Sequence, residues 1–192
     1  MDSGDMDIDD AVEVILDRLG YDLTNQHFKN TPLRVASMLQ AFCKNGDPGT
    51  AGRLLEVAFV EPGTVESLVL EGPISYTSFC AHHMLPVEGV AWVGYIPNHA
   101  VCGLSKLARV VHHFAEQLTV QEVVTQQIAD ALMDHLQPIG AMVVIDARHG
   151  CMSIRGVRER ECYTKTSTVR GVFKDSATAK AEFLTLMQLG KG

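Results

Sequence analysis

The spacing of apolar residues changes at about residue 65 of this chain. Before that point apolar residues recur every three or four positions, which is typical of amphipathic helices. Beyond it, short apolar runs typical of strands come in two pairs, and two long helical patterns separate the pairs. A helical pattern also closes the chain. Runs of strands interrupted by a pair of helices predict an α+β fold, in which a small antiparallel sheet carries two helices on one face.

Start and stop signals predict two helices in the N-terminal part. The first begins at Asp9 or Asp10, whose carboxylate can cap it, and ends at Gly20. The second begins at Thr31-Pro32, a capping hydroxyl followed by proline at the first helical position.

The link between the two halves contains proline and several glycines. Residues 47–53 are expected to form a loop, and residues 54–59 a short helix. We therefore divide the chain into a helical N-terminal region, residues 1–64, and a second domain, residues 65–192.

The second domain is expected to hold the sheet and three helices. Pro73 interrupts the first strand, so this strand either lies at an edge or carries a bulge. Ser105 can cap the first of the paired helices, and Ser176 can cap the last helix. The expected strands cover residues 67–79, 88–96, 141–147 and 162–170, and the paired helices cover residues 105–118 and 120–136.

Charge and hydropathy exclude several classes of partner. The formal net charge of −7 argues against nucleic acid as the main partner. No apolar run approaches the roughly 18 residues that a membrane span needs. The acidic N-terminus lacks the basic and then apolar pattern of a secretion signal. We therefore expect a cytoplasmic protein without a membrane partner.

The five cysteines are expected to be reduced thiols, because their number is odd and their spacing fits no disulfide framework. Three of them, Cys43, Cys102 and Cys162, are expected to be small buried hydrophobic residues. The other two, Cys80 and Cys151, lie beside histidines and are candidates for chemistry.

Two short patches, Cys80-Ala81-His82-His83 and His149-Gly150-Cys151, combine metal-binding groups with proton-transfer groups. Cys80 and His83 are three apart, so both can reach one ion across a tight turn. His149 and Cys151 are two apart, so on a strand they project from the same face. Two cysteines and one histidine form a three-ligand zinc set, which leaves a fourth position open for water. His82 and either His83 or His149 then remain free for proton transfer.

Other interpretations of the two patches remain open. Closed structural zinc sites use similar Cys and His spacings, so the patches can form a site without chemistry. They can also be unrelated buried residues. If they bind a metal, two thiolate ligands favour zinc over iron.

Four cationic side chains can hold a polyphosphate. Lys106 and Arg109 lie three apart and share a helix face, although a solvated face has the same spacing. Arg155 precedes a glycine, which permits close approach of the backbone to an anion. Arg34 lies in the first turn of its helix, where the positive end of the helix also favours an anion.

The acidic residue Glu122 follows Gln121 at the start of a predicted helix. A solvated acid in a first helical turn is one interpretation, because it interacts favourably with the helix dipole. A partner for a base is the other. A carboxylate can accept two parallel hydrogen bonds from the N1–H and the 2-amino group of guanine, a pair of donors that adenine and the pyrimidines lack.

Taken together, these residues resemble the GTP cyclohydrolase I family over nearly the whole chain. The matching motifs occur in the family's order, and their combination is highly specific. They are Thr31-Pro-Leu-Arg-Val-Ala, Cys80-x-His-His, Tyr95-Ile-Pro, Gly103-Leu-Ser-Lys-Leu-Ala-Arg, Val120-Gln-Glu, Thr125-Gln-Gln-Ile-Ala-Asp, Cys151-Met-x-x-Arg-Gly-Val-Arg, Thr166-Ser-x-x-Arg-Gly-Val-Phe and Glu182-Phe-Leu.

The resemblance implies a tunnelling fold (T-fold), with the catalytic domain in residues 65–192. In this family the sheets of five subunits join into a barrel, and two rings stack into a homodecamer. The family's sites lie at subunit interfaces, so the cationic side chains need not all come from one chain. The activity implied is hydrolytic opening of the GTP imidazole ring at C8, with release of formate and rearrangement to 7,8-dihydroneopterin triphosphate.

Carried over residue by residue, the resemblance implies three groups of site residues. Cys80, His83 and Cys151 would bind Zn²⁺ as the cofactor, and His82 and His149 would transfer protons. The substrate-binding residues would be Glu122 on guanine with Gln121 beside it, Lys106, Arg109, Arg155 and Arg34 on the triphosphate, and Ser105 near the ligand.

Two positions depart from the family's pattern. Ala81 stands where a glutamate is usual, and Ser37 stands where a lysine is typical. Loss of a group behind a metal ligand can cost about 10–100-fold in metal affinity or activity. The departures leave two alternatives. One is a related purine-nucleotide hydrolase with a shifted substrate or an arrest at the formyl intermediate. The other is a non-catalytic, zinc-stabilised ring protein that binds nucleotide.

Overall fold

The computed structural model describes residues 6–44, 46–47, 49–56, 58–60 and 67–189. Contacts divide the chain into two compact units, Met1–Lys44 and Asn45–Gly192. The domain boundary expected between residues 64 and 65 falls outside the described residues.

The first unit contains the two predicted N-terminal helices. Helix α1 covers Ile8–Arg18 and helix α2 covers Thr31–Phe42. The first helix begins earlier than predicted, because Asp10 lies inside it and accepts a hydrogen bond from the Asp7 backbone N–H at 3.1 Å. Helix α2 has proline in its first turn as predicted, but Thr31 already lies inside the helix and Asn30 is the N-cap residue, so the prediction of Thr31 as the cap is wrong. The Thr31 hydroxyl lies 3.5 Å from the His27 carbonyl oxygen instead.

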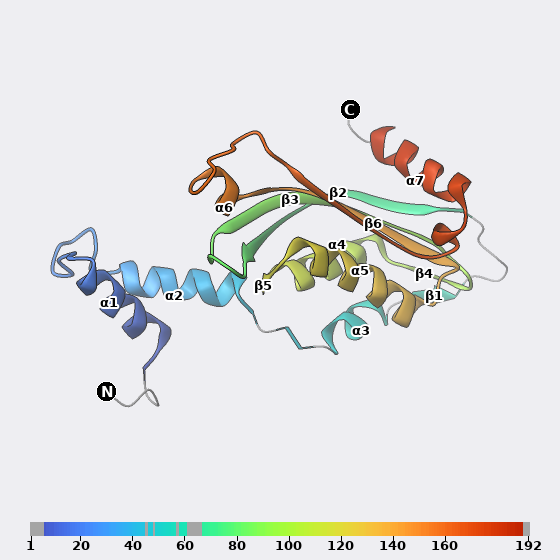
Figure 1. The fold of residues 1–192 in the computed structure, drawn as a ribbon. Coiled ribbons are helices and arrows are strands. Elements are labelled where there is room, and N and C mark those ends of the chain that lie inside the picture. The colour runs from blue at the N-terminus through green and yellow to red at the C-terminus, as the bar shows by residue number, and fades with distance from the viewer. Residues whose placement is uncertain (1–5, 45, 48, 57, 61–66, 190–192) are drawn as a thin grey trace. The chain divides into compact units, whose positions relative to one another are not determined.

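The second unit contains a five-stranded sheet, a separate two-stranded ladder and the remaining helices (Figure 1). Its elements in chain order are α3 Thr50–Leu55, β1 Ala58–Val60, β2 Val69–Cys80, β3 Pro86–Ile96, β4 Ala100–Cys102, α4 Leu104–Ala115, β5 Leu118–Thr119, α5 Gln121–Leu136, β6 Gly140–His149, α6 Gly150–Ser153, β7 Thr164–Gly171, the short 3-10 helix η1 Val172–Lys174 and α7 Ala177–Leu189.

The large sheet has the strand order β5-β2-β3-β6-β7. Strands β2, β3, β6 and β7 pair antiparallel, as predicted. Strand β5 pairs parallel to the end of β2, so the sheet is mixed rather than purely antiparallel. The predicted bulge in the first strand is confirmed, because the β2–β3 register shifts between Glu71 and Ile74, on either side of Pro73.

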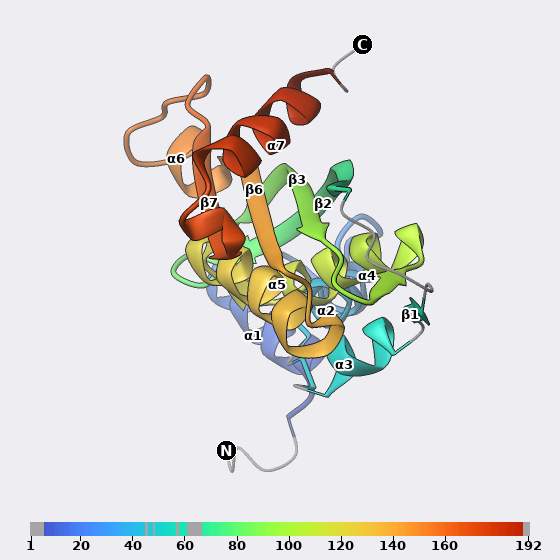
Figure 2. The ribbon, with the colours of Figure 1, turned by 90° about the vertical axis from the view of Figure 1, so that its right-hand side faces the viewer.

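Apolar residues alternate across the sheet and make a core on each face. Along β6, Val143 and Ile145 belong to the core under α4 and α5, whereas Met142 and Val144 belong to the core under α7. Figures 1 and 2 show α7 on the opposite side of the sheet from α4 and α5. The prediction of helices on one face is therefore incomplete, because the second apolar face is covered by Phe183 and its neighbours.

Three predicted helix starts can be compared with the structure. Helix α3 replaces the helix expected at residues 54–59, since Asp47 accepts the Gly49 N–H at 3.0 Å and supports an earlier helix start. Helix α4 begins after Gly103, so Ser105 lies inside the first turn instead of capping it. The Ser176 cap is confirmed, because its hydroxyl accepts the Ala179 N–H at 3.1 Å.

All five cysteines are free thiols, as expected. Cys102 is buried and Cys43 is half-buried, but Cys162 is exposed, so its prediction as a buried residue is wrong. Cys162 lies between α6 and β7, in a segment whose side chains face solvent. Among the described helices, none combines the length and the apolar character needed to cross a membrane.

Truncating a side chain beneath α5 is expected to destabilise the fold. Leu132 is fully buried in the core shared by α4, α5 and the sheet. Leu132→Ala should lower the free energy of unfolding by about 2–5 kcal/mol, since it removes buried methyl groups and leaves a cavity. Leu189→Ala, at a side chain that is 74% exposed, is the control and should change stability by less than about 0.5 kcal/mol. Thermal unfolding midpoints measure both, and equal midpoints for the two variants would contradict this core assignment.

Candidate active site

Neighbouring strand ends bring the two cysteine–histidine patches together. Strand β2 ends at Cys80 and strand β6 ends at His149, and β3 lies between these strands. His149 pairs with Val87 across the β3–β6 ladder. The short parallel pairing of Cys80 with Thr119 places the start of α5 at the same corner. The sheet topology therefore gathers segments that lie up to about 70 residues apart in the sequence.

A tight turn after β2 positions the double histidine. The backbone N–H groups of His83 and Met84 donate to the Cys80 carbonyl at 3.3 and 2.8 Å. The Ala81 N–H donates to the Thr119 carbonyl at 3.1 Å, which ties the turn to β5. The turn thus returns the His83 ring to the Cys80 thiol, as the three-residue spacing predicted.

Cys151 reaches the same place by a different route from the one predicted. It lies in the short helix α6 rather than on a strand with His149. The intervening Gly150 makes this change of direction possible, because a Cβ atom there would lie 2.8 Å from the Pro86 carbonyl oxygen. The glycine therefore lets α6 pack directly against the start of β3.

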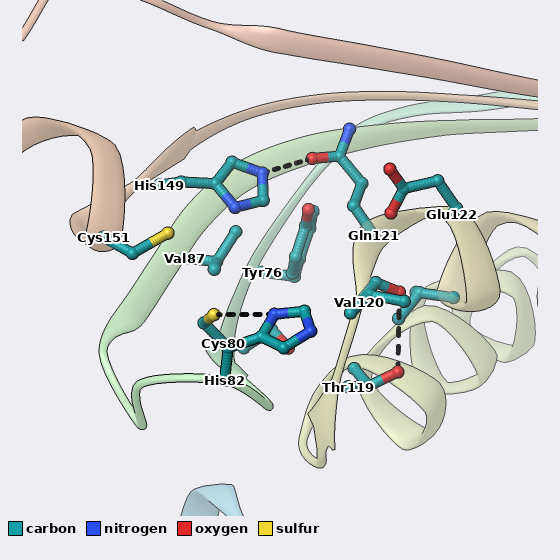
Figure 3. A pocket seen from close by; sticks show the side chains of 12 residues that line it. Tyr76, Cys80, His82, Val87, Thr119, Val120, Gln121, Glu122, His149 and Cys151 are labelled. Carbon is teal, nitrogen blue, oxygen red and sulfur yellow. Dashed lines mark hydrogen bonds between the residues drawn. The ribbon is translucent and has the colours of Figure 1, made fainter. Parts of the chain in front are cut away.

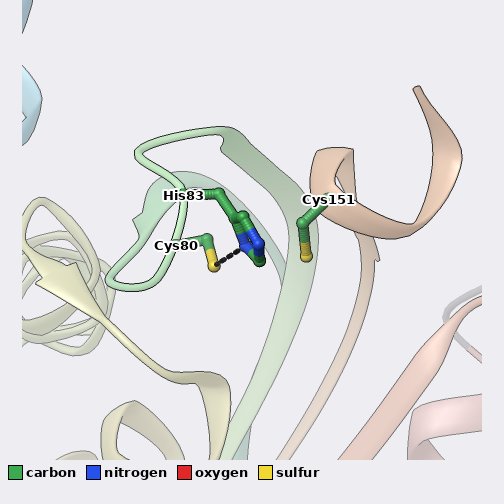
Figure 4. Close-up of side chains that lie close together, drawn as sticks. All are labelled: Cys80, His83 and Cys151. Atoms are coloured by element: carbon green, nitrogen blue, oxygen red, sulfur yellow. Dashed lines mark hydrogen bonds between the residues drawn. The ribbon is translucent and has the colours of Figure 1, made fainter. Parts of the chain in front are cut away.

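The structure brings Cys80, His83 and Cys151 together as a candidate metal site (Figure 4). Their ligand atoms all lie within 4.8 Å of one another, and Cys80 Sγ lies 3.8 Å from His83 Nδ1. Zinc–ligand bonds of about 2.0–2.3 Å in a tetrahedron place ligand atoms roughly 3.5–3.8 Å apart, so this donor set suits zinc. Burial, and then the nearby Cys80 thiol, raise the pKa of Cys151. A cation between the two sulfurs would offset the repulsion between their thiolates.

A pocket lies beside this metal set (Figure 3). Two of the metal-set residues, Cys80 and Cys151, form part of its wall. The wall also contains four other residues singled out in the sequence, His82, His149, Gln121 and Glu122. The wall residues that the sequence reasoning did not identify are Tyr76, Ser78, Val87, Thr119, Val120 and Val124.

Strand alternation could have identified two of these wall residues. Tyr76 and Ser78 precede Cys80 at intervals of two on β2, so all three project from one face of the strand. Burial raises the pKa of the Tyr76 hydroxyl, and the Asp146 charge acts in the same direction. Tyr76 therefore presents a neutral hydroxyl to the pocket.

The two candidate proton-transfer histidines lie on different sides of the pocket (Figure 3). His82 is exposed, and its Nδ1 atom lies 3.9 Å from Cys80 Sγ. His149 is half-buried, and its Nε2 atom lies 2.8 Å from Gln121 Oε1. Burial lowers the pKa of His149, while the Glu122 charge partly opposes this shift.

The predicted phosphate-binding residues lie outside the wall of this pocket, as far as the described residues define it. Ser105, Lys106 and Arg109 lie on α4, and Arg155 lies just after α6. Ser105, Arg109 and Arg155 are exposed. Arg34 belongs to α2 in the other unit of the chain.

The sequence was compared with models of protein families. The family model described as GTP cyclohydrolase I matches residues 8–188. The chain belongs to the GTP cyclohydrolase I family. The resemblance seen in the sequence motifs is therefore confirmed.

Individual relatives agree with this family over most of their length. The GTP cyclohydrolase 1 of Gloeobacter violaceus is 47% identical over 178 residues, which cover 93% of this chain and 82% of the relative. The GTP cyclohydrolase 1 of Carboxydothermus hydrogenoformans is 44% identical over 183 residues, covering 94% of this chain and 93% of the relative. The protein of the same name from Dictyostelium discoideum is 40% identical over 181 residues, covering 94% and 77%.

Proposed function

We propose that this chain is an enzyme that opens the imidazole ring of GTP at C8, releases formate and forms 7,8-dihydroneopterin triphosphate. The observation that carries the proposal is one pocket that combines a Cys/His/Cys metal set, two histidines and an acidic side chain. A member of the GTP cyclohydrolase I family needs these groups together, and relatives that share 40–47% identity carry the name of that activity.

The metal in this proposal is Zn²⁺, held by Cys80, His83 and Cys151. Three protein ligands leave one position open, and zinc bound in this way activates water at neutral pH. The chain's own contribution is to hold two sulfurs and one imidazole close enough to share one ion.

Glu122 is proposed to bind the guanine base. It occupies the first turn of α5, at the wall of the pocket, and its side chain is exposed to an incoming ligand. Its carboxylate can accept hydrogen bonds from both N1–H and the 2-amino group of guanine. Gln121 lies beside it at the start of the helix. This contact orients the purine so that its imidazole ring faces the histidines and the metal set.

His149 is proposed to protonate N7 of the bound purine. Protonation at N7 draws electrons from C8 and makes that carbon more open to attack by water. Because burial lowers the pKa of His149, its protonated form is a stronger acid than a free imidazolium. His82, on another side of the pocket, is proposed to exchange protons during ribose opening and pterin ring closure.

The triphosphate is proposed to bind Lys106, Arg109, Arg155 and Arg34, with Ser105 near the ligand. These residues suit a site completed by a neighbouring subunit, because Ser105 and Arg109 on α4 and Arg155 just after α6 are exposed. We propose accordingly that the chain adopts the T-fold, joins its sheets into a barrel and forms a cytoplasmic homodecamer with interfacial sites.

The role of Glu122 can be tested with ITP, which retains N1–H but lacks the 2-amino group. The parent should prefer GTP by about 10–100-fold in kcat/KM, the effect of one hydrogen bond to a charged group. Glu122→Gln should lose about 100-fold or more of its kcat/KM for GTP and most of this preference. Rates of formate release from each nucleotide give both ratios.

The control variant is Glu182→Gln, at an exposed acid on α7. It should keep the parental rates with both nucleotides. A Glu122→Gln variant that still distinguished GTP from ITP as well as the parent does would contradict the assigned role of this carboxylate.

A further inference from the structure

Gln121 connects His149 to the interior of the protein. Gln121 is buried, with only 5% of its surface exposed. The amide nitrogen lies 2.9 Å from the Thr164 carbonyl oxygen and 3.4 Å from the Ile145 carbonyl oxygen. Carbonyl oxygens only accept hydrogen bonds, so the NH₂ group must face them. A flipped amide would place its oxygen against these two oxygens, so the position of Oε1 beside His149 is determined.

Two threonine hydroxyls extend this network and fix its direction. Thr125 Oγ1 lies 2.6 Å from the Gln121 backbone carbonyl, which can only accept, so Thr125 donates there. Thr166 Oγ1 lies 2.7 Å from Thr125 Oγ1 and must therefore be the donor in that pair. Thr166 Oγ1 keeps its lone pairs and accepts a hydrogen bond from the Gln121 amide nitrogen at 3.1 Å.

The fixed amide decides which nitrogen of His149 carries hydrogen. Gln121 Oε1 has no hydrogen to give, and it lies 2.8 Å from His149 Nε2. Nε2 must therefore be the donor in this contact. In the neutral ring the lone pair then lies on Nδ1, and Figure 3 shows this second nitrogen turned away from Gln121 into the pocket.

We propose that Gln121 is a positioning residue, which holds His149 in the Nε2–H tautomer so that Nδ1 is the atom that exchanges a proton with the substrate. The inference deepens the proposed function and rests on it for the identity of the substrate. In the protonation step, the Nδ1–H bond of the imidazolium breaks and an N7–H bond of the purine forms. The other hydrogen stays covalently bound to Nε2 and hydrogen-bonded to Gln121 Oε1 throughout, so loss of the Nδ1 proton returns the ring to the neutral Nε2–H tautomer. An uncharged amide fixes this tautomer without adding a charge to the pocket.

The tautomer can be measured directly by ¹⁵N NMR of the zinc-loaded protein labelled at histidine nitrogens, at a pH where His149 is neutral. His149→Ala identifies the His149 signals by their disappearance. The parent should show a protonated, pyrrole-like Nε2 and an unprotonated, pyridine-like Nδ1. Gln121→Met keeps the side-chain length but removes the acceptor, and it should shift the two signals toward a mixture of tautomers.

The kinetic effect should appear in kcat rather than in KM. Gln121→Met should lower kcat by about 10–100-fold, the usual effect of losing a group that orients a functional side chain. KM for GTP should stay within about threefold of the parent. Thr166→Val should cause a smaller loss of the same kind, because the Thr164 carbonyl still holds the amide. The control Gln188→Met, at an exposed glutamine on α7, should behave as the parent.

A double-mutant cycle separates positioning from direct binding. If Gln121 acts through His149, adding Gln121→Met to His149→Ala should cause no further loss in kcat or in the affinity for GTP. If Gln121 instead binds guanine, the substitution should weaken GTP binding equally in both backgrounds, and the inference fails.

Two further results would overturn the proposed role of Gln121 or separate it from the proposed function. An unchanged tautomer in Gln121→Met overturns the inference whatever its activity. If Gln121→Met does not fold, Gln121→Leu, which also removes the acceptor beside His149 Nε2, answers the same question, and an unshifted spectrum in that variant overturns the inference. A parent protein that releases no formate from GTP would contradict the proposed function, whereas the tautomer is measured without turnover and tests this inference alone.

Discussion

Cys151→Ala is expected to lose both its zinc and its formate release from GTP. Cys151 supplies one of the two sulfurs in the candidate metal set, and the remaining cysteine and histidine cannot complete a three-ligand site. Activity should fall by more than about 100-fold, which is the upper range for losing a residue that merely supports a ligand. Zinc content per chain, measured by atomic absorption after dialysis, should fall from about one to near zero.

Cys162→Ala is the matched control for this cysteine. Cys162 is exposed and lies outside the pocket wall. Its variant should retain both the metal and the rate. Full zinc occupancy and parental activity in Cys151→Ala would show that the zinc binds elsewhere.

His149→Ala is expected to lower kcat by about 10²–10⁴-fold, the range for losing a general acid. The loss should be confined to chemistry, because the three metal ligands and the Glu122 contact remain. Zinc content and the affinity for GTP should therefore stay close to those of the parent. Rapid-quench measurement of formate and calorimetric titration with GTP separate the chemical step from binding.

The exposed His99, outside the pocket, provides the comparison for this variant. His99→Ala should keep the parental kcat. A His149→Ala variant with near-parental kcat would remove His149 from the mechanism. It would also leave the Gln121 network without a catalytic purpose.

The main architecture was predictable because its signals are local. Short apolar runs identified β3, β6 and most of β2, and the Thr31-Pro32 and Ser176 signals identified helix starts. The two-residue strand β5 was not predicted, since its parallel pairing with β2 depends on a contact between Phe79 and Leu118, which are 39 residues apart. The same kind of tertiary contact, between the sheet and Phe183, places α7 on the second face.

The site was predictable to the extent that chemistry is tied to motifs. The spacing of Cys80 and His83 in a turn suffices to predict that they meet, and the structure brings them together with Cys151. The sequence placed Cys151 on a strand with His149. The turn into helix α6 was not predictable, because it depends on the close approach of Gly150 to Pro86 in the folded protein. The hydrogen bond of Gln121 to His149 was also hidden, since it depends on side-chain directions that no periodicity encodes.

The most direct test of the proposed activity is the mass balance of one reaction. Purified zinc-loaded protein is incubated with GTP, and the products are identified by mass spectrometry while formate is measured enzymatically. We expect one formate for each 7,8-dihydroneopterin triphosphate formed from GTP. Unchanged GTP, or a formylated intermediate that accumulates without formate, would contradict the proposed reaction.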